Sequence, residues 1–424
     1  MINIFHKNFI INNIYLKISG SKSITNRLLI INKIFNNIKL KNISNSDDSK
    51  LLIKILKKNK KYINVKNSGS VLRFLITFLC IKNKKSFLYG VKRMYKRPIN
   101  YLIKSLCNIG ANIKYLKKIK YPPILIKNFI LKKKYINIYS NISSQYISSL
   151  LLNVLLLNNK IKIILKKKII SIPYIRMTYL ILKYLRINIY KKKNIFIINN
   201  KKKIKKRIYF YIESDWTSIS YYYSLAVFFK KFNLKLGYFY KNSLQGDSII
   251  SKIYYKYFNI NTIYNKKYIY IYKNKNININ IKNIYLNLNK FPDLAQTIII
   301  TLCLLKKNFY IEGLETLNIK ETNRLIALKT ELKKIGVIVK INFSSIRLKK
   351  YLKINCKKIR IINTYNDHRM VMSFIPICLL YKNFYIDNYN VVKKSYPLFW
   401  KDLKKLHFFL KFYEYKKETN KKTN

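Results

Sequence analysis

Apolar side chains recur every three or four residues in two parts of the chain. This spacing predicts an amphipathic helix in each, one built on Ile24, Leu28, Ile31 and Phe35 and the other on Leu325, Leu328, Leu332 and Ile335. A third helix is expected to begin at Pro98, because proline suits the first helical turn, and to end at Gly110. The short run from Ile113 to Leu116 then predicts a strand.

The same order of helix, stop and strand repeats along the chain. After Gly110 it recurs at Arg186, Asn259 and Gly336, at spacings of 76, 73 and 77 residues. Glycine, and less readily asparagine, adopts the left-handed conformation that ends a helix, whereas arginine fits it poorly. Weaker copies lie near Lys60 and Leu406. A period of this length predicts about six similar α/β units.

The composition is that of a globular protein with sizeable cores. Of the 424 residues, 50% are hydrophobic, which argues against disorder, and the length suggests two domains or one repeat architecture. The five cysteines and three histidines show no disulfide framework or zinc spacing. We find no secretory signal, and the longest uncharged run, Ser140 to Asn159, is too polar for a membrane span. We therefore expect a cytoplasmic protein with no bound metal.

The charge is extreme, with 87 Lys and Arg against 15 Asp and Glu, a formal net charge of +72. Such a balance can attract nucleic acid. However, Lys, Asn, Ile and Tyr share A/T-rich codons and are abundant together, so compositional drift explains it better. The segment 201–206 then predicts a solvated turn, and Lys416 to Asn424 a frayed tail. Against this background, short clusters of Arg, Asp, Glu, Gly and Pro indicate sites that need particular side chains.

Three segments in the first hundred residues combine a turn, a helix start and arginine. They are Ser19 to Arg27, Asn67 to Arg73 and Arg93 to Pro98. Free backbone N–H groups at a helix N-terminus bind anions, and arginine adds a bidentate fork for phosphate. Each segment alone could be a helix cap with a surface arginine. Together they favour a small ligand that carries several negative charges.

Hydroxyl and amide side chains occupy two further turns. Ser143, Ser144 and Gln145 precede an apolar helical run, and Ser171 to Tyr174 follow a strand-like one. Such residues are commonly plain helix caps. Beside the arginines they would also supply neutral hydrogen bonds to sugar-like hydroxyls.

Carboxylates suited to proton transfer occur later in the chain. Asp293 leads into an apolar helix, where it could be only an N-cap. The segment from Lys320 to Arg324 opens a helix, so Lys320, Glu321 and Arg324 would crowd one end, as an ordinary ion pair or as a tuned acid–base group. Two last clusters contain Asp367-His368-Arg369 and Lys393-Lys394-Ser395.

These segments form an ordered set over roughly positions 15 to 405. The motifs are Gly20-Ser-Lys-Ser with Asn26-Arg27, Asn67-Ser-Gly-Ser with Arg73, Arg93-Met with Arg97-Pro, Ser143-Ser-Gln, Ser171-x-Pro-Tyr174, Gln245-Gly-Asp, Pro292-Asp293, Lys320-Glu-Thr-x-Arg324 and Asn366-Asp-His-Arg-Met. The set resembles the EPSP synthase family, the 3-phosphoshikimate 1-carboxyvinyltransferases. Each motif alone is weak, whereas the ordered set is highly specific.

The resemblance implies a mixed α/β fold, an α+β inside-out barrel-like arrangement of two domains that each contain three βαβαββ units. Residues 1–20 and 213–412 would form the first domain, residues 21–212 the second, and residues 413–424 the tail. The chain would leave the first domain near Gly20 and return near Glu213.

The implied reaction transfers the enolpyruvyl group of phosphoenolpyruvate to the 5-hydroxyl of shikimate 3-phosphate and releases phosphate by addition and elimination. No metal or organic cofactor is implied. The expected partners are the two small substrates alone, without membrane or specific nucleic acid, and we expect a monomer.

The family's residue roles carry over by matching motif positions. By resemblance, Asp293 accepts a proton, Glu321 donates one and Lys22 bridges both substrates. The implied ligands of shikimate 3-phosphate are Lys22, Ser23, Arg27, Ser143, Ser144, Gln145, Ser171, Tyr174, Asp293 and Lys320. Those of phosphoenolpyruvate are Lys22, Gly69, Arg97, Gln145, Arg324, His368, Arg369 and Lys394. His368 is also expected to support Glu321 and Arg369.

Several positions depart from the family pattern and bear on turnover and affinity: Ser19, Ser70, Thr316 and Asn323 replace Pro, Thr, Asn and Asp, and Ser214 and Trp216 alter the segment before Ser218. One alternative is the enolpyruvyl transferase acting on UDP-N-acetylglucosamine, whose family has Lys-Asn at Lys22-Ser23 and a catalytic cysteine loop that we do not find. Another is a non-catalytic basic protein that binds nucleic acid, which would not need Asp293, Glu321 or His368.

Overall fold

The computed structural model describes residues 1–6, 10–58, 60–199, 207–273, 282–353, 360–381 and 384–413. Within these residues the strands form five four-stranded sheets and one two-stranded sheet. Each four-stranded sheet contains two neighbouring parallel strands, and the second of these also pairs with the first of two antiparallel strands. These two strands form a hairpin in four of the sheets, whereas in the fifth they are β1 and β22 from opposite ends of the chain. The expected turn at 201–206 and the tail from Lys416 lie outside the described residues.

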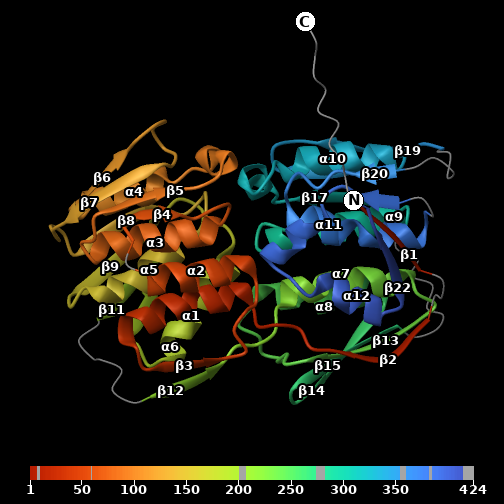
Figure 1. Cartoon of the computed structure of the whole chain (residues 1–424), viewed down its shortest axis with the longest axis horizontal. Helices are drawn as coiled ribbons and strands as arrows, with labels where there is room; N and C mark the ends of the chain where they lie inside the picture. The colour runs from red at the N-terminus through yellow and green to blue at the C-terminus, as the bar shows by residue number, and fades with distance from the viewer. Residues whose placement is uncertain are drawn as a thin grey trace, which may run out of the picture.

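Three sheets come from the middle of the chain (Figure 1). The first unit contains β4 (Tyr62–Asn64), α3 (Gly69–Ile81), β5 (Ser86–Tyr89), the 3-10 helix η1 (Lys92–Lys96), α4 (Asn100–Asn108), β6 (Ala111–Tyr115) and β7 (Ile124–Phe129). The second contains β8 (Tyr135–Tyr139), α5 (Ser144–Asn153), η2 (Val154–Leu156), β9 (Lys160–Lys166), α6 (Ile172–Tyr184), β10 (Ile189–Lys192) and β11 (Ile195–Asn199). The third contains α1 (Lys22–Phe35), β3 (Ile38–Lys41), α2 (Asp47–Lys57) and β12 (Ile208–Tyr211).

Of the other three sheets, two combine an N-terminal strand with strands from the C-terminal part of the chain, and the third lies wholly within that part. One unit contains β2 (Ile10–Leu16), α7 (Trp216–Phe228), β13 (Lys231–Gly237), η3 (Gly246–Ile249), α8 (Ile250–Phe258), β14 (Ile260–Asn265) and β15 (Tyr268–Lys273). The next contains β16 (Asn283–Asn287), η4 (Pro292–Leu294), α9 (Ala295–Leu304), β17 (Asn308–Glu312), η5 (Glu315–Ile319), α10 (Arg324–Lys334), β18 (Val337–Ile341) and β19 (Ser345–Tyr351). The last contains β20 (Arg360–Ile362), α11 (His368–Phe374), η6 (Ile375–Leu379), β21 (Phe384–Ile386), η7 (Tyr389–Lys394), α12 (Phe399–Lys405), β22 (Phe408–Phe412) and β1 (Ile2–His6).

Buried apolar side chains form two clusters. One extends from Ile24 to Ile212, and we call this part of the molecule the central half. The other combines Ile2 to Ile18 with Trp216 to Phe408, and we call it the terminal half. The two halves lie side by side in Figure 1. The chain crosses between them twice at one place, where the Ser21 amide donates to the carbonyl of Glu213 at 2.8 Å.

The predicted mixed α/β class and its repeats are confirmed. The helix stops at Gly110, Arg186, Asn259 and Gly336 all have positive φ, of 113°, 59°, 51° and 75°. The copy near Leu406 is also present, since α12 ends there and β22 follows. Arg186 adopts the left-handed conformation in spite of its side chain, because its amide bonds back to Lys183 and closes the helix.

Two sequence-based expectations differ from the structure. The helix expected from Pro98 begins at Asn100 instead, and the Pro98 carbonyl accepts a hydrogen bond from the Tyr146 hydroxyl at 2.5 Å. The copy of the repeat near Lys60 shows the predicted order, since α2 ends at Lys57 and β4 follows at Tyr62, but within the described residues its unit lacks a full sheet. Its sheet consists of β3 and β12 alone, paired in parallel, without an antiparallel hairpin.

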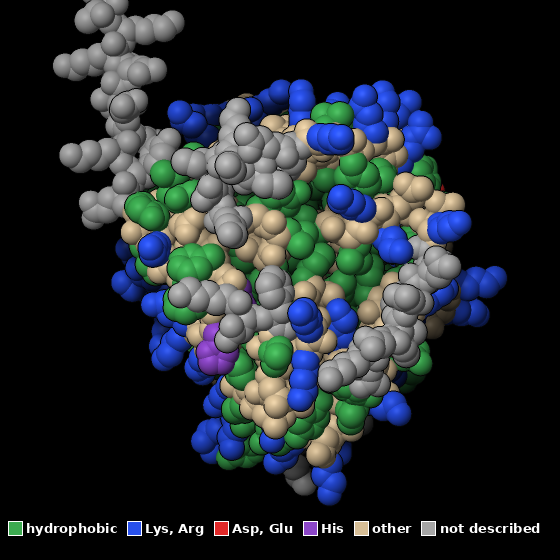
Figure 2. Space-filling model, turned by 90° about the vertical axis from the view of Figure 1, so that its right-hand side faces the viewer, with side chains coloured by type: hydrophobic (Ala, Val, Ile, Leu, Met, Phe, Trp, Pro, Cys, Tyr) green, Lys and Arg blue, Asp and Glu red, His purple; other side chains and the backbone are tan. Residues whose placement is uncertain are grey.

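Lysine and arginine side chains are scattered over the visible face of the molecule among apolar and neutral ones (Figure 2). They do not gather into one stripe on this face, which agrees with a composition-wide excess of lysine. Within the described part of the chain, each helix is too short or too polar to cross a bilayer.

Candidate active site

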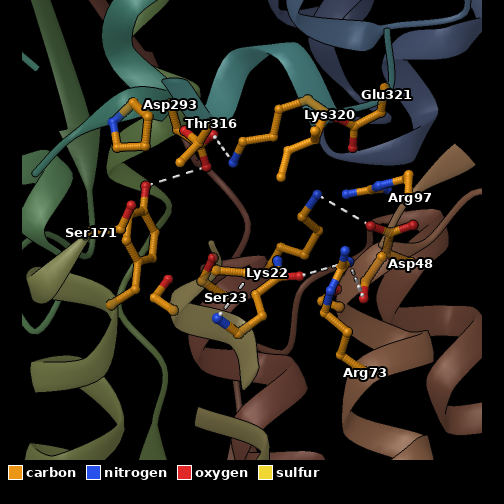
Figure 3. Close-up of a pocket in the computed structure, with 18 of the residues that line it drawn as sticks. Lys22, Ser23, Asp48, Arg73, Arg97, Ser171, Asp293, Thr316, Lys320 and Glu321 are labelled. Carbon is orange, nitrogen blue, oxygen red and sulfur yellow. Dashed lines mark hydrogen bonds and ion pairs between the residues drawn. The ribbon is translucent and has the colours of Figure 1, made fainter. Parts of the chain in front are cut away.

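A pocket between the two halves brings together all the predicted site residues except Lys394. It is lined by Lys22, Ser23, Arg27, Gly69, Arg97, Ser143, Ser144, Gln145, Ser171, Tyr174, Asp293, Lys320, Glu321, Arg324, His368 and Arg369. Figure 3 shows Asp293, Lys320 and Glu321 on the wall opposite Lys22, Ser23 and Arg73. Residues that the sequence reasoning left without a role also line it: Asn26, Asp48, Ser70, Arg73 and Thr316.

The start of α1 forms one wall. Ser21 caps the helix by accepting from the Ile24 amide, and Lys22 and Ser23 in the first turn line the pocket. Arg27 is buried one turn later. Its Nε donates to Thr178 Oγ1 at 2.7 Å and its Nη1 to the Ser23 carbonyl at 2.7 Å. Burial lowers the pKa of Arg27 to about 10, so it keeps its charge at neutral pH.

Lys22 makes an ion pair that the sequence did not indicate. Its Nζ lies 3.3 Å from Asp48 Oδ2, and Figure 3 shows the two side chains reaching toward each other. Asp48 lies in the first turn of α2, two residues after the capping residue Ser46. Acidic residues are common there because they interact well with the helix dipole. The helix dipole is therefore a sufficient reason for an aspartate at this position, and the sequence does not indicate its contact with Lys22.

The start of α3 holds two arginines close together. A Cβ atom at Gly69 would lie 2.5 Å from Arg73 Nη1 and 2.5 Å from Arg97 Nη2, so only glycine leaves them this space. Arg73 donates to Gln145 Oε1 at 3.1 Å and to the Gly69 carbonyl at 3.0 Å. Arg97 is 4% exposed, and its Nε and Nη1 have no hydrogen-bond partner among the described residues.

Arg93 does not act as expected from its segment. Its guanidinium donates to the Lys320 carbonyl at 2.9 Å and 3.2 Å, through Nη2 and Nε. The side chain therefore joins the central half to the loop that carries Lys320 and Glu321. It positions that loop and is not itself a lining residue of the pocket.

Asp293 is an ion-pair centre and not the N-cap that its position allowed. Its side chain makes no cap hydrogen bond. Its oxygens lie 3.0 Å from Arg369 Nη2, 3.3 Å from Lys320 Nζ and 3.5 Å from Arg324 Nη1. Burial raises the pKa of Asp293, but these three charges outweigh it and hold the pKa well below its usual range.

Glu321 is bound by cations from two elements. Arg324 Nη2 and Lys394 Nζ each lie 2.9 Å from its carboxylate. Lys394 also donates to the Asn67 carbonyl at 2.9 Å and so bridges the halves at the edge of the pocket. Burial raises the pKa of Glu321, while Lys394 and Arg324 lower it by more, so the pKa lies well below its usual range. Helix α10 begins only at Arg324, so Glu321 lies in the preceding loop.

His368 opens α11 and is 1% exposed. Burial and the charge of Lys22 lower its pKa well below the usual value, so the ring is neutral. Neither ring nitrogen has a hydrogen-bond partner within the described ranges, so the expected support of Glu321 and Arg369 involves no hydrogen bond. The ring lines the pocket with both nitrogens free to bind a ligand.

The hydroxyl residues divide into caps and non-caps. Ser143 caps α5 by accepting from the Gln145 amide at 3.3 Å. Ser171 has a φ of 50° and makes no cap bond, so its hydroxyl is available to the pocket. Among the departures, Asn323 caps α10 as an aspartate would, and Ser70 Oγ accepts from Asn26 at 3.3 Å. These two substitutions therefore keep the local structure of the site.

The sequence of the chain is similar to those of known proteins. A family model described as EPSP synthase (3-phosphoshikimate 1-carboxyvinyltransferase) matches residues 57–403. A 3-phosphoshikimate 1-carboxyvinyltransferase of Bacteroides fragilis is 34% identical over 397 residues, covering 93% of this chain and 96% of its own. One from Buchnera aphidicola subsp. Cinara cedri is 35% identical over 420 residues, covering 91% and 93%.

Two solved structures have the same fold. An EPSP synthase from Acinetobacter baumannii superposes with a TM-score of 0.69 at 18% identity, covering 97% of this chain and 99% of its own. The enolpyruvyl transferase NikO from Streptomyces tendae has a TM-score of 0.70 at 11% identity, covering 97% and 98%.

Proposed function

Because the chain belongs to the EPSP synthase family, we propose that the pocket between its halves is the active site and that the side chains described above carry out the reaction. The chain transfers the enolpyruvyl group of phosphoenolpyruvate to the 5-hydroxyl of shikimate 3-phosphate and releases phosphate, a step of aromatic amino acid biosynthesis. Its substrates are small molecules.

The unpaired donors of Arg97 are the observation that carries the assignment of the site. A buried guanidinium with free N–H groups is costly unless a ligand accepts from them, and a phosphate or carboxylate does so bidentately. Seven Lys and Arg side chains line the pocket against three carboxylates, an excess of four positive charges. Two phosphorylated carboxylate substrates would balance this excess.

The two substrates divide the pocket. Shikimate 3-phosphate would be bound by Ser23, Arg27, Ser143, Ser144, Ser171, Tyr174 and Lys320. Phosphoenolpyruvate would be bound by Gly69, Arg97, Arg324, His368, Arg369 and Lys394. Lys22 and Gln145 would contact both substrates. The hydroxyl donors would face the sugar-like ring, and three of the arginines, Arg97, Arg324 and Arg369, would face the smaller ligand.

Two carboxylates supply the proton transfers in this assignment. Asp293 would accept the proton of the 5-hydroxyl, and Glu321 would protonate the methylene carbon. Without substrate, Glu321 is a poor proton donor, because the charges of Lys394 and Arg324 lower its pKa. When an anionic substrate binds the same cations, their effect on Glu321 weakens and its pKa rises toward the range of a general acid.

We further propose two domains, residues 1–20 with 213–412 and residues 21–212, and a cytoplasmic monomer. The two separate apolar clusters and the paired crossover at Ser21 and Glu213 support this division. The tail at 413–424 would belong to neither domain.

The alternatives have less support. The Bacteroides and Buchnera relatives are both named as 3-phosphoshikimate 1-carboxyvinyltransferases, and Ser23 stands where the UDP-N-acetylglucosamine enzymes have asparagine. For a basic protein that binds nucleic acid, the face in Figure 2 offers no gathered stripe of cations.

Phosphate release from phosphoenolpyruvate tests the proposal. Purified protein should release phosphate on addition of shikimate 3-phosphate and not on addition of UDP-N-acetylglucosamine. Folded protein that released none with either acceptor would refute the assignment, and release with the nucleotide sugar alone would transfer it to the first alternative.

A further inference from the structure

The motif Gln245-Gly246-Asp247 lies outside the pocket lining and yet ties the two halves together. Gln245 Oε1 accepts from Ser21 Oγ at 2.8 Å, at the chain crossover. A Cβ atom at Gly246 would lie 2.2 Å from Pro173 Cβ, so glycine allows η3 to approach the start of α6. This approach brings Asp247 within hydrogen-bond distance of the Tyr174 hydroxyl.

Asp247 is a buried carboxylate that the proposed chemistry does not use. It is 2% exposed, and it accepts from Thr217 Oγ1 at 2.5 Å and from the Tyr174 hydroxyl at 2.9 Å. No Lys, Arg or His forms an ion pair with it among the described residues. Buried carboxylates without a cation favour the protonated form.

The Tyr174 hydroxyl lies between two carboxylates. It is 2.9 Å from Asp247 Oδ1 and 3.2 Å from Asp293 Oδ2. A tyrosine hydroxyl has one proton and can donate to only one of them at a time. When both carboxylates are ionised, one of these contacts therefore sets oxygen lone pairs against each other. A single additional proton on either carboxylate allows both contacts to be hydrogen bonds. The protonated carboxyl then donates to the Tyr174 oxygen, and the Tyr174 hydroxyl donates to the other carboxylate.

The two carboxylates differ in their tendency to hold that proton. Asp293 has three cations within 3.5 Å, whereas Asp247 has none at ion-pair distance in the described part of the chain. Burial and the charge of Asp293 raise the pKa of Asp247 to about 6, and that of Asp293 lies well below its usual range. A general base works best when its pKa lies near the working pH, so Asp293 alone is poorly matched to its task.

We propose that Asp247 is the resting place of the proton that Asp293 removes from the substrate hydroxyl, and that Tyr174 passes the proton between them. This inference rests on the proposed function. Asp247 acts only through Tyr174 and is a positioning residue rather than a catalytic one. Asp293 thereby returns to its ionised form among its three cations.

The proton transfers balance as follows. The hydroxyl O–H bond breaks, its electron pair forms the bond to the enol carbon, and the proton bonds to Asp293, while the C=C π pair takes a proton from Glu321. Asp293 gives a proton to the Tyr174 oxygen as the Tyr174 hydroxyl gives its own to Asp247 Oδ1. When the phosphate leaves with the electron pair of its C–O bond, Glu321 takes back a proton from the methyl group, whose C–H pair forms the new C=C bond, and the proton on Asp247 returns along the same path to the phosphate. Each turnover leaves the three residues as they began.

The pH dependence of turnover tests the relay. Asp247 is faced by Tyr174 from α6, Thr217 from α7, Asp293 from η4 and Arg369 from α11. In the wild type, kcat should fall as pH drops through about 6, because Asp247 is then already protonated. Asp247→Asn should lower kcat by about 10- to 100-fold, remove this acid limb and change the KM values little. Thr217→Val, which removes a hydrogen bond to the ionised form, should move the limb to higher pH.

A matched control is available in the terminal half. Asp402 is also buried and accepts from a tyrosine, Tyr396, at 2.7 Å, but it lies on α12 away from the pocket. Asp402→Asn should keep both kcat and the acid limb. If Asp247→Asn keeps the wild-type profile, or if Tyr174→Phe combined with Asp247→Asn multiplies the two single losses, the relay is wrong. Absence of phosphate release by the wild type would instead overturn the proposed function, and with it the need for a relay.

Discussion

Arg324 and Asp367 form a buried fork beneath the pocket. Arg324 Nε lies 2.8 Å from Asp367 Oδ2 and Nη2 lies 3.3 Å from Oδ1, and the two side chains are 1% and 0% exposed. The same guanidinium reaches Glu321 at 2.9 Å and Asp293 at 3.5 Å. Asp367 therefore fixes the cation that, among the described residues, alone contacts both proposed catalytic carboxylates.

Replacement of Asp367 should destabilise the fold. Asp367→Asn keeps a side-chain oxygen that can cap α11, where Asp367 accepts from the Arg369 amide at 2.9 Å, but it removes the negative charge facing Arg324. Loss of one partner from a buried pair costs about 3–5 kcal/mol, measurable by urea unfolding. Asp47→Asn, on an exposed carboxylate in the first turn of α2, is the control and should change stability by less than about 1 kcal/mol. Equal stabilities of the two variants would contradict this role of Asp367.

The proposed proton-transfer residues should be separable from binding residues by kinetics. Asp293→Asn and Glu321→Gln should each lower kcat by about 10² to 10⁴, the usual range for general acid–base groups. Phosphate release at saturating substrates measures the effect. A loss below tenfold in either variant would remove that residue from the mechanism.

Gly69→Ala should weaken phosphoenolpyruvate binding more than turnover. The added methyl group would push Arg97 and Arg73 apart, because their Nη atoms lie 2.5 Å from its position. We expect the KM for phosphoenolpyruvate to rise at least tenfold, with a smaller change in kcat, in steady-state kinetics. Gly237→Ala is the matched control, since its methyl group meets the side-chain end of Tyr15 away from the pocket. Equal effects of the two substitutions would count against the cradle at Gly69.

Glu213 should make stability depend on pH. Burial raises its pKa to about 7 from an ordinary value of 4.5, so the folded state binds this proton more tightly than the unfolded one. The contribution is fully present below pH 4.5 and is lost as the pH rises through about 7. Glu213→Gln should flatten this part of the curve, in urea unfolding at pH 5, 6, 7 and 8. Parallel curves for wild type and variant would show that Glu213 titrates normally.

Local signals in the sequence were enough to predict where several of the repeated helices begin and end. The helix ends at Asn259 and Gly336 follow from backbone preferences of single residues, and the helix starts at Lys22 and Gly69 follow from the serine caps before them. These features depend on neighbours in the chain. The motif set then predicted most of the residues that line the pocket, because the motifs lie at such helix starts.

Contacts between distant segments could not be read in the same way. Asp48 belongs to none of the sequence motifs, and only the structure shows it beside Lys22. Arg93 looked like an anion ligand, although it binds the carbonyl of Lys320 in the other half. Asp247 belongs to the Gln245-Gly-Asp motif, but that motif gave it no role, since its pairing with Tyr174 joins residues 73 positions apart. Such pairings depend on how the halves pack, which no local preference encodes.

The place of β1 between β21 and β22 sets the order in which the molecule can be completed during synthesis. Residues 22–211 contain every strand of their three sheets, so this half can finish folding soon after it leaves the ribosome. Ile2 and Ile4, made first, gain their sheet partners only when Phe384 to Phe412 emerge. Translation that stops before Phe384 therefore leaves one finished half attached to another that still exposes its apolar strands to chaperones and proteases.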